Sequence, residues 1–298
     1  MKVLAKATAP GLVGESDLRR AVDEVAVCTS LRPCQSNLFE ITFLSPEIAR
    51  RAQPGEFAQI WVERGHLPLL RRPFSFSRAD PEGGTVSFYL GVVGEGSRRL
   101  RGMALGHRIQ LLGPLGRGFS LPERPGRSAL VSGGLGAAPF PLLAERLAAR
   151  GEDLLWINGA RNSAELYPAE LIPAGIAHVF QFSEDGSQGQ SGRVTVGLQP
   201  LLERIDRVYA CGPNPMLAAV ATKLAELAAP GVEPPQLEVS IEAPMGCGFG
   251  TCLGCSIPLR NSGASPESVI GLCCRQGPVL RGDALAWEPF LRQPAHLG

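Results

Sequence analysis

Two patterns of hydrophobic residues divide the chain. From about residue 21 to 120, short apolar stretches alternate with Gly, Pro and polar turns, a pattern typical of an antiparallel barrel or sandwich. The strands expected there are Phe57–Val62, Phe74–Ser77, Thr85–Leu90 and Arg108–Leu112, with one helix from Ser97 to about Met103. The first 20 residues show neither pattern, and we expect a weakly ordered arm there.

From about residue 127 strands and helices alternate. The expected strands are Ala129–Ser132, Leu154–Ile157, His178–Phe182 and Arg207–Cys211, and the expected helices are Pro139–Arg150 and Met216–Ala228. Pro139 at a helix start and Gly151 just past its end are typical boundary residues. Such alternation predicts a parallel sheet with helices packed on it. Beyond about residue 235 the chain becomes rich in loops and cysteine.

These changes of pattern predict a multidomain protein. The expected parts are an N-terminal arm (1–20), an antiparallel β-barrel domain (21–122), an α/β parallel-sheet domain (123–232) and a small cysteine-rich C-terminal domain with a tail (233–298). The length of 298 residues suits this division, because a domain typically takes about 100–200 residues.

Composition and charge exclude several classes of protein. Hydrophobic residues are 44% and charged residues 19%, so the chain can bury a core, and the net charge of +1 gives no electrostatic case for binding nucleic acid. The longest uncharged stretch, Ser128–Ala144, is interrupted by glycine and proline, and a bilayer helix needs about 20 apolar residues. No signal peptide is visible. We expect a cytoplasmic protein without membrane contact, whose cysteines are not paired as disulfides.

Five of the eight cysteines fall between residues 247 and 274. Cys247, Cys252 and Cys255 have the C-x4-C-x2-C spacing of plant-type [2Fe–2S] ferredoxins, and a fourth cysteine follows at Cys273 or Cys274. The neighbouring glycines allow a backbone to wrap around a two-iron cluster. A structural zinc site usually shows two C-x2–4-C pairs, and only one is present. The segment therefore predicts an iron–sulfur cluster.

Two stretches of the first domain predict a flavin site. Arg72 precedes Pro73, Phe74 and Ser75, and a guanidinium beside a hydroxyl can bind a pyrophosphate. A glycine turn then leads from Gly91 to Gly96 and into a helix at Ser97, and helix N-termini attract phosphates. The alternative is an arginine on an exposed edge strand followed by a common turn, which would have the same sequence. With the cysteine segment downstream, however, the two stretches favour FAD, because FMN lacks a pyrophosphate.

A nucleotide site is expected in the second domain. Gly133, Gly134 and Gly136 lie between a strand and a helix, the context of a dinucleotide pyrophosphate, although the spacing is not G-x-G-x-x-G. Cys211 ends a later strand, where ligands bind in open α/β sheets; a buried core thiol is the alternative. Arg161 could bind the 2′-phosphate of NADP, stack on adenine or face solvent, so the choice between NAD and NADP stays open.

In this order the motifs resemble the ferredoxin-reductase family and, more narrowly, the electron-transfer subunits of bacterial NAD-dependent (type B) dihydroorotate dehydrogenases. The resemblance covers about residues 22–285 and is carried by Arg72-Pro73-Phe74-Ser75, Gly96-Ser97, Gly133-Gly134-Leu135-Gly136, Ser183–Ser187, Cys211-Gly212-Pro213, Cys247–Cys255 and Cys274–Val279. Ser97 stands where the family favours Thr. The arm, the loop 261–268 and the tail after Asp283 lie outside the pattern.

The resemblance implies roles for single residues. It implies FAD contacts by Arg72, Pro73, Phe74, Ser75, Tyr89, Leu90, Gly91, Gly96 and Ser97. It brings Cys211 towards the nicotinamide and flavin rings. It places the fourth cluster ligand at Cys274, three residues before Gly277-Pro278, and leaves Cys273 as a buried apolar residue.

The chain shows no acid–base constellation for an organic substrate, and its four histidines (His66, His107, His178 and His296) are scattered. We therefore expect sites for NAD(H), FAD and a [2Fe–2S] cluster but no site for an organic substrate. Electrons from the cluster must then pass to a partner protein that carries out the second reaction. The resemblance implies an oxidoreductase subunit that passes electrons between NAD+ and an FMN-containing partner oxidising dihydroorotate to orotate in pyrimidine biosynthesis, within a heterotetramer. The alternatives are the small subunit of a sulfide dehydrogenase or of an NADH-dependent ferredoxin:NADP oxidoreductase, and a redox-responsive binding module.

Overall fold

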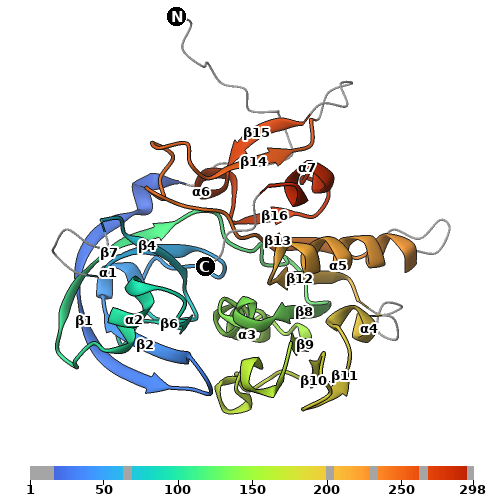
Figure 1. Ribbon diagram of the computed structural model, residues 1–298, viewed down its shortest axis with the longest axis horizontal. Helices are drawn as coiled ribbons and strands as arrows, with labels where there is room; N and C mark the ends of the chain where they lie inside the picture. The colour runs from blue at the N-terminus through green and yellow to red at the C-terminus, as the bar shows by residue number, and fades with distance from the viewer. Residues whose placement is uncertain (1–16, 63–68, 199–204, 228–233, 262–267, 294–298) are drawn as a thin grey trace, which may run out of the picture.

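A computed structural model describes residues 17–62, 69–198, 205–227, 234–261 and 268–293. Two large sheets lie side by side, and the cysteine-rich segment lies across one end of both (Figure 1). Most of the expected arm, the middle of the 261–268 loop, the end of the tail, His66 and His296 lie outside the described residues. The last arm residues form a short 3-10 helix, η1 (Leu18–Arg20), in which Arg20 forms an ion pair with Glu56 at 2.6 Å, so the expectation of a weakly ordered arm is wrong there.

The first sheet is antiparallel throughout and has the strand order β4-β3-β7-β1-β2-β6-β5. Its strands are β1 (Val22–Pro33), β2 (Leu38–Leu44), β3 (Phe57–Trp61), β4 (Arg72–Ser75), β5 (Arg78–Asp80), β6 (Thr85–Gly91) and β7 (Arg108–Leu115). Only Phe76 and Ser77 separate the two edge strands, and their N–H groups donate to the carbonyls of Glu56 (3.2 Å) and Ser87 (2.8 Å). One short segment therefore joins both edges, and the sheet curls into a barrel.

Alternation along these strands builds the barrel core. In β2, for example, Phe39, Ile41 and Phe43 are fully buried in one apolar cluster. Two short helices, α1 (Pro46–Ala49) and α2 (Glu95–Arg101), accompany the sheet. Helix α2 begins before the expected Ser97, because that hydroxyl accepts hydrogen bonds from the N–H groups of Val93 (2.9 Å) and Gly94 (3.1 Å) and so lies inside the first turn.

The second sheet has the order β11-β10-β9-β8-β12-β13-β16. Its strands are β8 (Arg127–Gly133), β9 (Asp153–Ala160), β10 (His178–Ser183), β11 (Gln190–Ser191), β12 (Arg207–Cys211), β13 (Gln236–Ser240) and β16 (Val279–Arg281). Its helices are η2 (Gly134–Ala137), α3 (Phe140–Ala148), η3 (Ser163–Glu165), η4 (Ala169–Leu171), α4 (Val194–Leu198) and α5 (Asn214–Leu227). Neighbours are parallel from β11 to β13, but β16 is antiparallel to β13.

The strands within the expected α/β domain, β8 to β12, are parallel as predicted. The whole sheet is mixed, because β16 from the C-terminal segment adds an antiparallel edge. The chain leaves β13 for the cysteine segment and returns beside the same strand without a crossover helix across the sheet, so it adds in the opposite direction. The expected boundary at residue 233 also cuts this sheet, since β13 and β16 both follow it. The remaining C-terminal elements are β14 (Ser256–Leu259), β15 (Val269–Leu272), α6 (Cys273–Gln276) and α7 (Trp287–Leu291).

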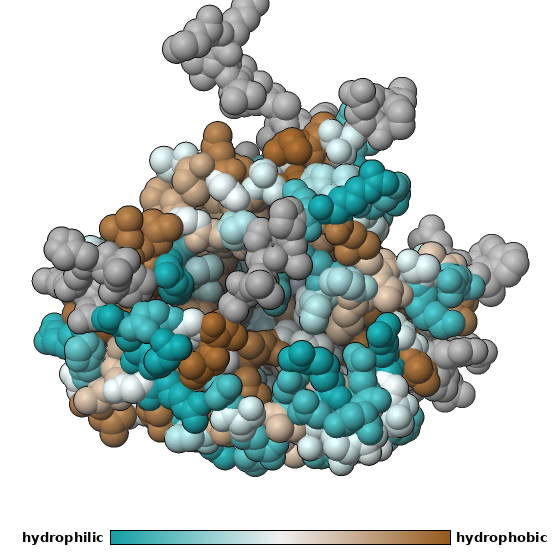
Figure 2. All heavy atoms as spheres, viewed as in Figure 1, coloured by the Kyte–Doolittle hydropathy of each residue, from teal (hydrophilic) through white to brown (hydrophobic). Residues whose placement is uncertain are grey.

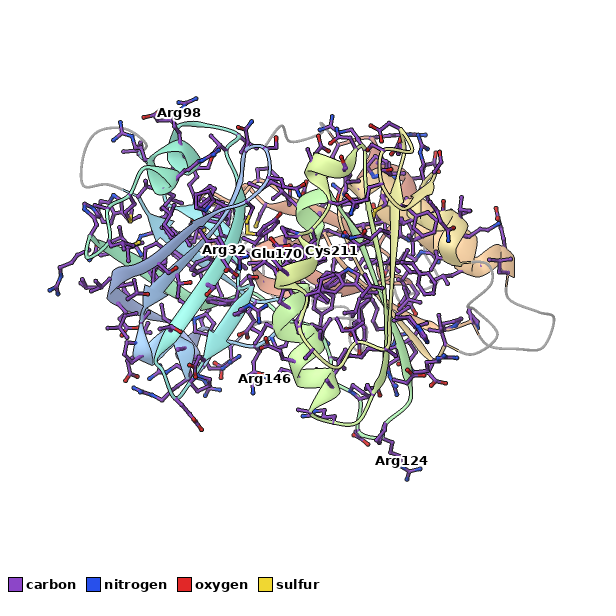
Figure 3. All side chains as sticks on the ribbon, turned by 90° about the horizontal axis from the view of Figure 1, so that it is seen from below. Arg32, Arg98, Arg124, Arg146, Glu170 and Cys211 are labelled. Carbon is purple, nitrogen blue, oxygen red and sulfur yellow. The ribbon has the colours of Figure 1, made fainter. Side chains whose placement is uncertain are left out.

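The two domains share an apolar core. Tyr89 of the barrel packs against Tyr167 at 4.7 Å between ring centroids, and Tyr167 stacks on Trp156 at 5.3 Å. Arg32 of β1 also pairs with Glu170 of η4 at 3.4 Å (Figure 3). These contacts hold the barrel and the second sheet in one relative position. Within the described residues no helix is long and apolar enough to cross a membrane.

Candidate functional site

The cysteine segment brings four thiols together as two pairs. Cys247, Cys252 and Cys255 lie on the loop between β13 and β14, and Cys274 lies in the single turn of α6. The sulfur atoms of Cys255 and Cys274 are 3.2 Å apart. The sulfur of Cys247 accepts hydrogen bonds from the backbone N–H groups of Thr251 (3.3 Å) and Cys252 (3.5 Å), which holds Cys247 beside Cys252.

This two-by-two arrangement suits a two-iron cluster better than a zinc ion. A structural zinc ion is surrounded by four ligands at one point, whereas these thiols form one pair of sulfurs and a second pair joined through the Cys252 N–H. A [2Fe–2S] cluster takes four thiolates spread over two irons. The donor set therefore fits the cluster that the spacing predicts.

The loop also favours the thiolate form that metal ligation requires. Burial alone would raise the pKa of the Cys247 thiol, but hydrogen bonds from the backbone of Cys252, Phe249 and Thr251 outweigh it and lower the pKa to about 7. The hydrogen bond from Cys274 lowers the pKa of Cys255 to about 6, and the same bond raises that of Cys274. One thiolate in each pair is thus stabilised before any metal binds.

Adjacent cysteines 273 and 274 point in different directions. Cys273 begins helix α6, where successive side chains are about 100° apart. The Cys273 sulfur lies near Gly277, 3.5 Å from where a Cβ there would be, and the residue is fully buried. Cys274 instead faces Cys255, so the geometry favours Cys274 as the ligand.

Two glycines of the cysteine loop have left-handed backbone conformations. A Cβ on Gly248 (φ +84°) would lie 2.7 Å from the Gln59 side chain, and one on Gly250 (φ +92°) would lie 3.0 Å from the Arg275 side chain. Glycine is favoured at both positions by conformation and by space. The loop is consequently packed against barrel strand β3 on one side and helix α6 on the other.

The structure brings the two expected flavin-binding stretches together. A Cβ on Gly96 would lie 3.2 Å from the Arg72 side chain, so α2 begins beside β4. Arg72 donates to the carbonyl of Leu70 (2.7 Å) and, within the described residues, forms no ion pair. Arg71 pairs with Asp23 at 2.7 Å. The charge of Arg72, rather than that of Arg71, remains for a phosphate.

Several other expected flavin contacts face away from this place. The Tyr89 ring lies in the interdomain core, Leu90 in the barrel core, and the Ser97 hydroxyl bonds within its own turn. Strand β5 pairs with β6 only over Thr85–Ser87, so in the described chain the edge of β6 from Tyr89 to Gly91 has no neighbouring strand on that side. These residues would therefore meet a flavin through their backbone.

The remaining residues of the Arg72–Ser75 motif lie along β4. Pro73 is paired with Gln59, and Ser75 with Phe57, across the β3–β4 ladder, while Phe74 packs against the barrel core. All are partly exposed. Since side chains alternate along a strand, Pro73 and Ser75 lie on the face opposite to that of Arg72 and Phe74.

The three glycines at the end of β8 differ in what surrounds them. A Cβ on Gly136 would lie 2.2 Å from the Cys211 carbonyl oxygen, and one on Gly133 would lie 2.5 Å from the Met216 sulfur. Gly134 (φ +54°) has no atom within 4 Å of such a Cβ. Gly133 and Gly136 therefore leave room for the β12–α5 turn, and Gly134 faces open space. The expectation that all three glycines admit a dinucleotide stays a prediction.

Cys211 ends β12 between Ser132 of β8 and Ser240 of β13. It is 9% exposed and belongs to the apolar core between the domains, near the middle of the molecule in Figure 3. Burial, followed by the Glu242 carboxylate, raises the pKa of its thiol to about 12. The side chain is thus a neutral thiol at the carboxyl end of the sheet, where ligands bind.

Arg161 lies on the surface and pairs with Glu165 at 2.8 Å. The Glu165 carboxylate therefore balances the charge of Arg161, the residue that could bind the 2′-phosphate of NADP. The pair gives no support for NADP over NAD.

The sequence missed two features near the cysteine loop. The first is Gln59, a buried polar residue beneath the loop. The sequence indicates it only as the one polar residue in the apolar strand Phe57–Trp61. The second feature is a set of exposed apolar side chains, which we call the apolar rim: Leu69 (76% exposed), Leu70 (52%), Phe249 (39%) and Leu253 (56%). Figure 2 shows hydrophobic surface around this end of the molecule.

Comparison with known proteins agrees with this geometry. The family model for the iron–sulfur cluster binding domain of dihydroorotate dehydrogenase B matches residues 242–286. The dihydroorotate dehydrogenase B (NAD(+)) electron transfer subunits of Desulforamulus reducens and Geobacillus thermodenitrificans are each 34% identical to this chain, over 85% of it and 94% of theirs.

Solved structures show the same architecture. The NADH-dependent reduced ferredoxin-NADP oxidoreductase, described for flavin-based electron bifurcation, is 26% identical with a TM-score of 0.77, over 91% of this chain and 92% of that one. A ferredoxin NADP+ reductase from Neisseria gonorrhoeae with bound FAD and NADP is 17% identical with a TM-score of 0.61, over 74% and 99%, and shows the fold alone. With the identity and coverage of the curated relatives, the chain belongs to the family of dihydroorotate dehydrogenase B electron transfer subunits.

Proposed function

We propose that this chain passes electrons between NAD+ and an FMN-containing catalytic subunit that oxidises dihydroorotate to orotate, in the cytoplasm. The observation that carries the proposal is the pairing of three thiols of the cysteine loop and one of helix α6, beside a flavin-type barrel against which the loop packs directly. Family membership supplies the substrate class, because the relatives are named for dihydroorotate and NAD(+).

The residues divide into three sites. We propose that Cys247, Cys252, Cys255 and Cys274 hold a [2Fe–2S] cluster. Arg72 to Ser75, the backbone of Tyr89 to Gly91, and Gly96 with Ser97 would hold FAD, and the loop at Gly134 with Cys211 would receive NAD(H). Bound FAD exchanges two electrons with a nicotinamide and single electrons with an iron–sulfur cluster. The barrel (21–122) and the second domain (123–232) would carry FAD and NAD(H), with β13 and β16 completing the second sheet.

The partner would dock on the apolar rim. Cys252 is exposed, and Leu70 lies 3.9 Å from where a Cβ on Gly246 would be, so the rim borders the cluster loop. Contiguous exposed apolar surface marks interaction sites. Docking there would bring the FMN subunit to the cluster, and two copies of each subunit would form the heterotetramer that the resemblance implies.

One observation favours a second function. The NADH-dependent ferredoxin-NADP oxidoreductase aligns over nearly all of both chains. Its identity of 26% is below the 34% shared with the dihydroorotate dehydrogenase subunits. We therefore rank it second.

Electron transfer across the rim gives the first prediction. The complex with the FMN subunit should reduce NAD+ with dihydroorotate, and Phe249→Glu should lower this activity at least about tenfold. Burying an unpaired charge costs several kcal/mol, and each 1.4 kcal/mol is about tenfold in binding. Oxidation of NADH by the variant with a dye acceptor should be unchanged. Val196→Glu, at an exposed position of α4, is the control. Activity only with ferredoxin and NADP would favour the second function.

The fourth cluster ligand gives the second prediction. Cys274→Ser should remove or distort the electron paramagnetic resonance signal of the reduced cluster, because its sulfur completes a pair with Cys255. Cys273→Ser should leave the signal nearly intact, since the Cys273 sulfur lies beside Gly277 and is not the one paired with Cys255. The reverse result would assign the ligand to Cys273.

The flavin site gives the third prediction. Arg72→Ala should lower FAD occupancy about tenfold or more, because a charged hydrogen bond to phosphate contributes about 1.5–3 kcal/mol. Arg71→Ala should retain FAD, since it loses a pair with half-exposed Asp23, which contributes about 0–1 kcal/mol. Chromatography of the released flavin measures both. Equal losses, or recovery of FMN alone, would refute the assignment.

Cys211 gives the fourth prediction. Cys211→Ala should keep FAD and cluster but slow flavin reduction by NADH in stopped-flow experiments. In the wild-type protein this rate should show no thiol titration between pH 6 and about 9, because the Cys211 pKa of about 12 keeps the thiol protonated there. Cys28→Ala, which alters another buried thiol, in the barrel core, is the matched control. An unchanged rate would make Cys211 a packing residue only.

A further inference from the structure

Strand β3 presents one face to the barrel and the other to the cysteine segment. Ala58 and Ile60 belong to the barrel core. Phe57, on the opposite face, belongs to the apolar core that contains Cys274. Since side chains alternate along a strand, Gln59 shares the face of Phe57. Gln59 is therefore part of the surface on which the cysteine segment rests.

Gln59 is fully buried, at 0% exposure, and within the described residues neither its Oε1 nor its Nε2 has a hydrogen-bond partner. Burying an amide without a partner costs about 1–3 kcal/mol. A methionine would fill similar space without that cost. Buried polar groups are nearly always paired, so an unpaired one calls for an explanation, and a bound group is one.

The amide lies directly against the cysteine loop. A Cβ built on Gly248 would be 2.7 Å from Gln59 Nε2 and 2.7 Å from its Cγ. Gly248 follows the ligand Cys247 immediately, and glycine there leaves the space that the amide fills. The contact joins a barrel strand to the residue next to a cluster ligand.

We propose that the Gln59 side-chain amide donates a hydrogen bond to a sulfur at the Cys247 end of the [2Fe–2S] cluster and raises the reduction potential of that cluster. This inference rests on the proposed function, because it requires a cluster in the cysteine loop. Gln59 acts as a positioning and tuning residue and is not a ligand.

The physical effect follows from charge. Reduction adds one electron to the cluster, and an N–H donor at a sulfur stabilises the added negative charge, most effectively where water is excluded. Hydrogen bonds to the sulfurs are among the factors that set iron–sulfur potentials. The Cys247 sulfur accepts backbone N–H groups of its own loop; Gln59 adds a donor from the flavin domain.

The position of Gln59 also links two sites. Its backbone pairs with Pro73 of the flavin-binding segment, while its side chain lies against Gly248. The amide contacts the cysteine loop, and this favours the cluster over the flavin as its partner.

The test is a redox titration of the complete flavoprotein carrying Gln59→Met. We expect wild-type cluster content and a cluster that is up to tenfold harder to reduce, which is 59 mV more negative for one electron. Paramagnetic resonance reports the cluster, and visible absorbance reports the flavin, whose potential should not change. Gln110→Met makes the same chemical change at a half-buried position of neighbouring β7 and should alter neither potential.

Gln59→Leu also removes the donor and should reproduce the shift, which protects the test against poor folding of one variant. An unchanged cluster potential in both variants overturns the inference. A shift of the flavin potential alone, or an equal cluster shift in Gln110→Met, overturns it as well. A wild-type protein without the reduced [2Fe–2S] signal would overturn the proposed function itself.

Discussion

The antiparallel pair β13–β16 is the constraint on which the rest of the site depends. Val239 faces Leu280, and Ser240 faces Val279, at the edge of the second sheet. The chain leaves for the cysteine loop from β13 and returns on β16, so both stems of the cysteine segment are anchored in one rigid sheet. The carbonyl of Gly277, three residues after Cys274, accepts the Arg117 N–H at 2.6 Å. The segment is thereby tied to the chain leaving the barrel as well.

This anchoring explains how a glycine-rich loop can hold three thiols in place beside the fourth, Cys274 of α6. A loop with few side chains contributes little packing of its own, and glycine loses more conformational freedom on folding than other residues. Here the order comes from outside the loop. Phe57 and Leu115 of the barrel pack in the same core as Cys255 and Cys274, so the barrel that carries the flavin segment also supports the cluster ligands.

The arrangement of the described residues suits an electron-transfer role. The histidines in the described residues, His107 and His178, are both exposed, and the buried thiol of Cys211 is held neutral. Cys252, which we propose as a cluster ligand, and the apolar rim are exposed, where another protein can approach.

The sequence by itself determined the chemistry and the order of the domains. Two local patterns carry the chemistry: the spacing of Cys247, Cys252 and Cys255, and the stretch Arg72–Ser75. Thiolates bind iron, and a guanidinium binds phosphate, whatever the rest of the fold. Packing between distant segments decided the rest. Only the fold shows that β16 makes the second sheet mixed, that Gly136 makes room for the Cys211 carbonyl, and that Gln59 lies beneath Gly248. Such contacts join residues far apart along the chain, and the space between two backbones leaves no periodic signal in either stretch.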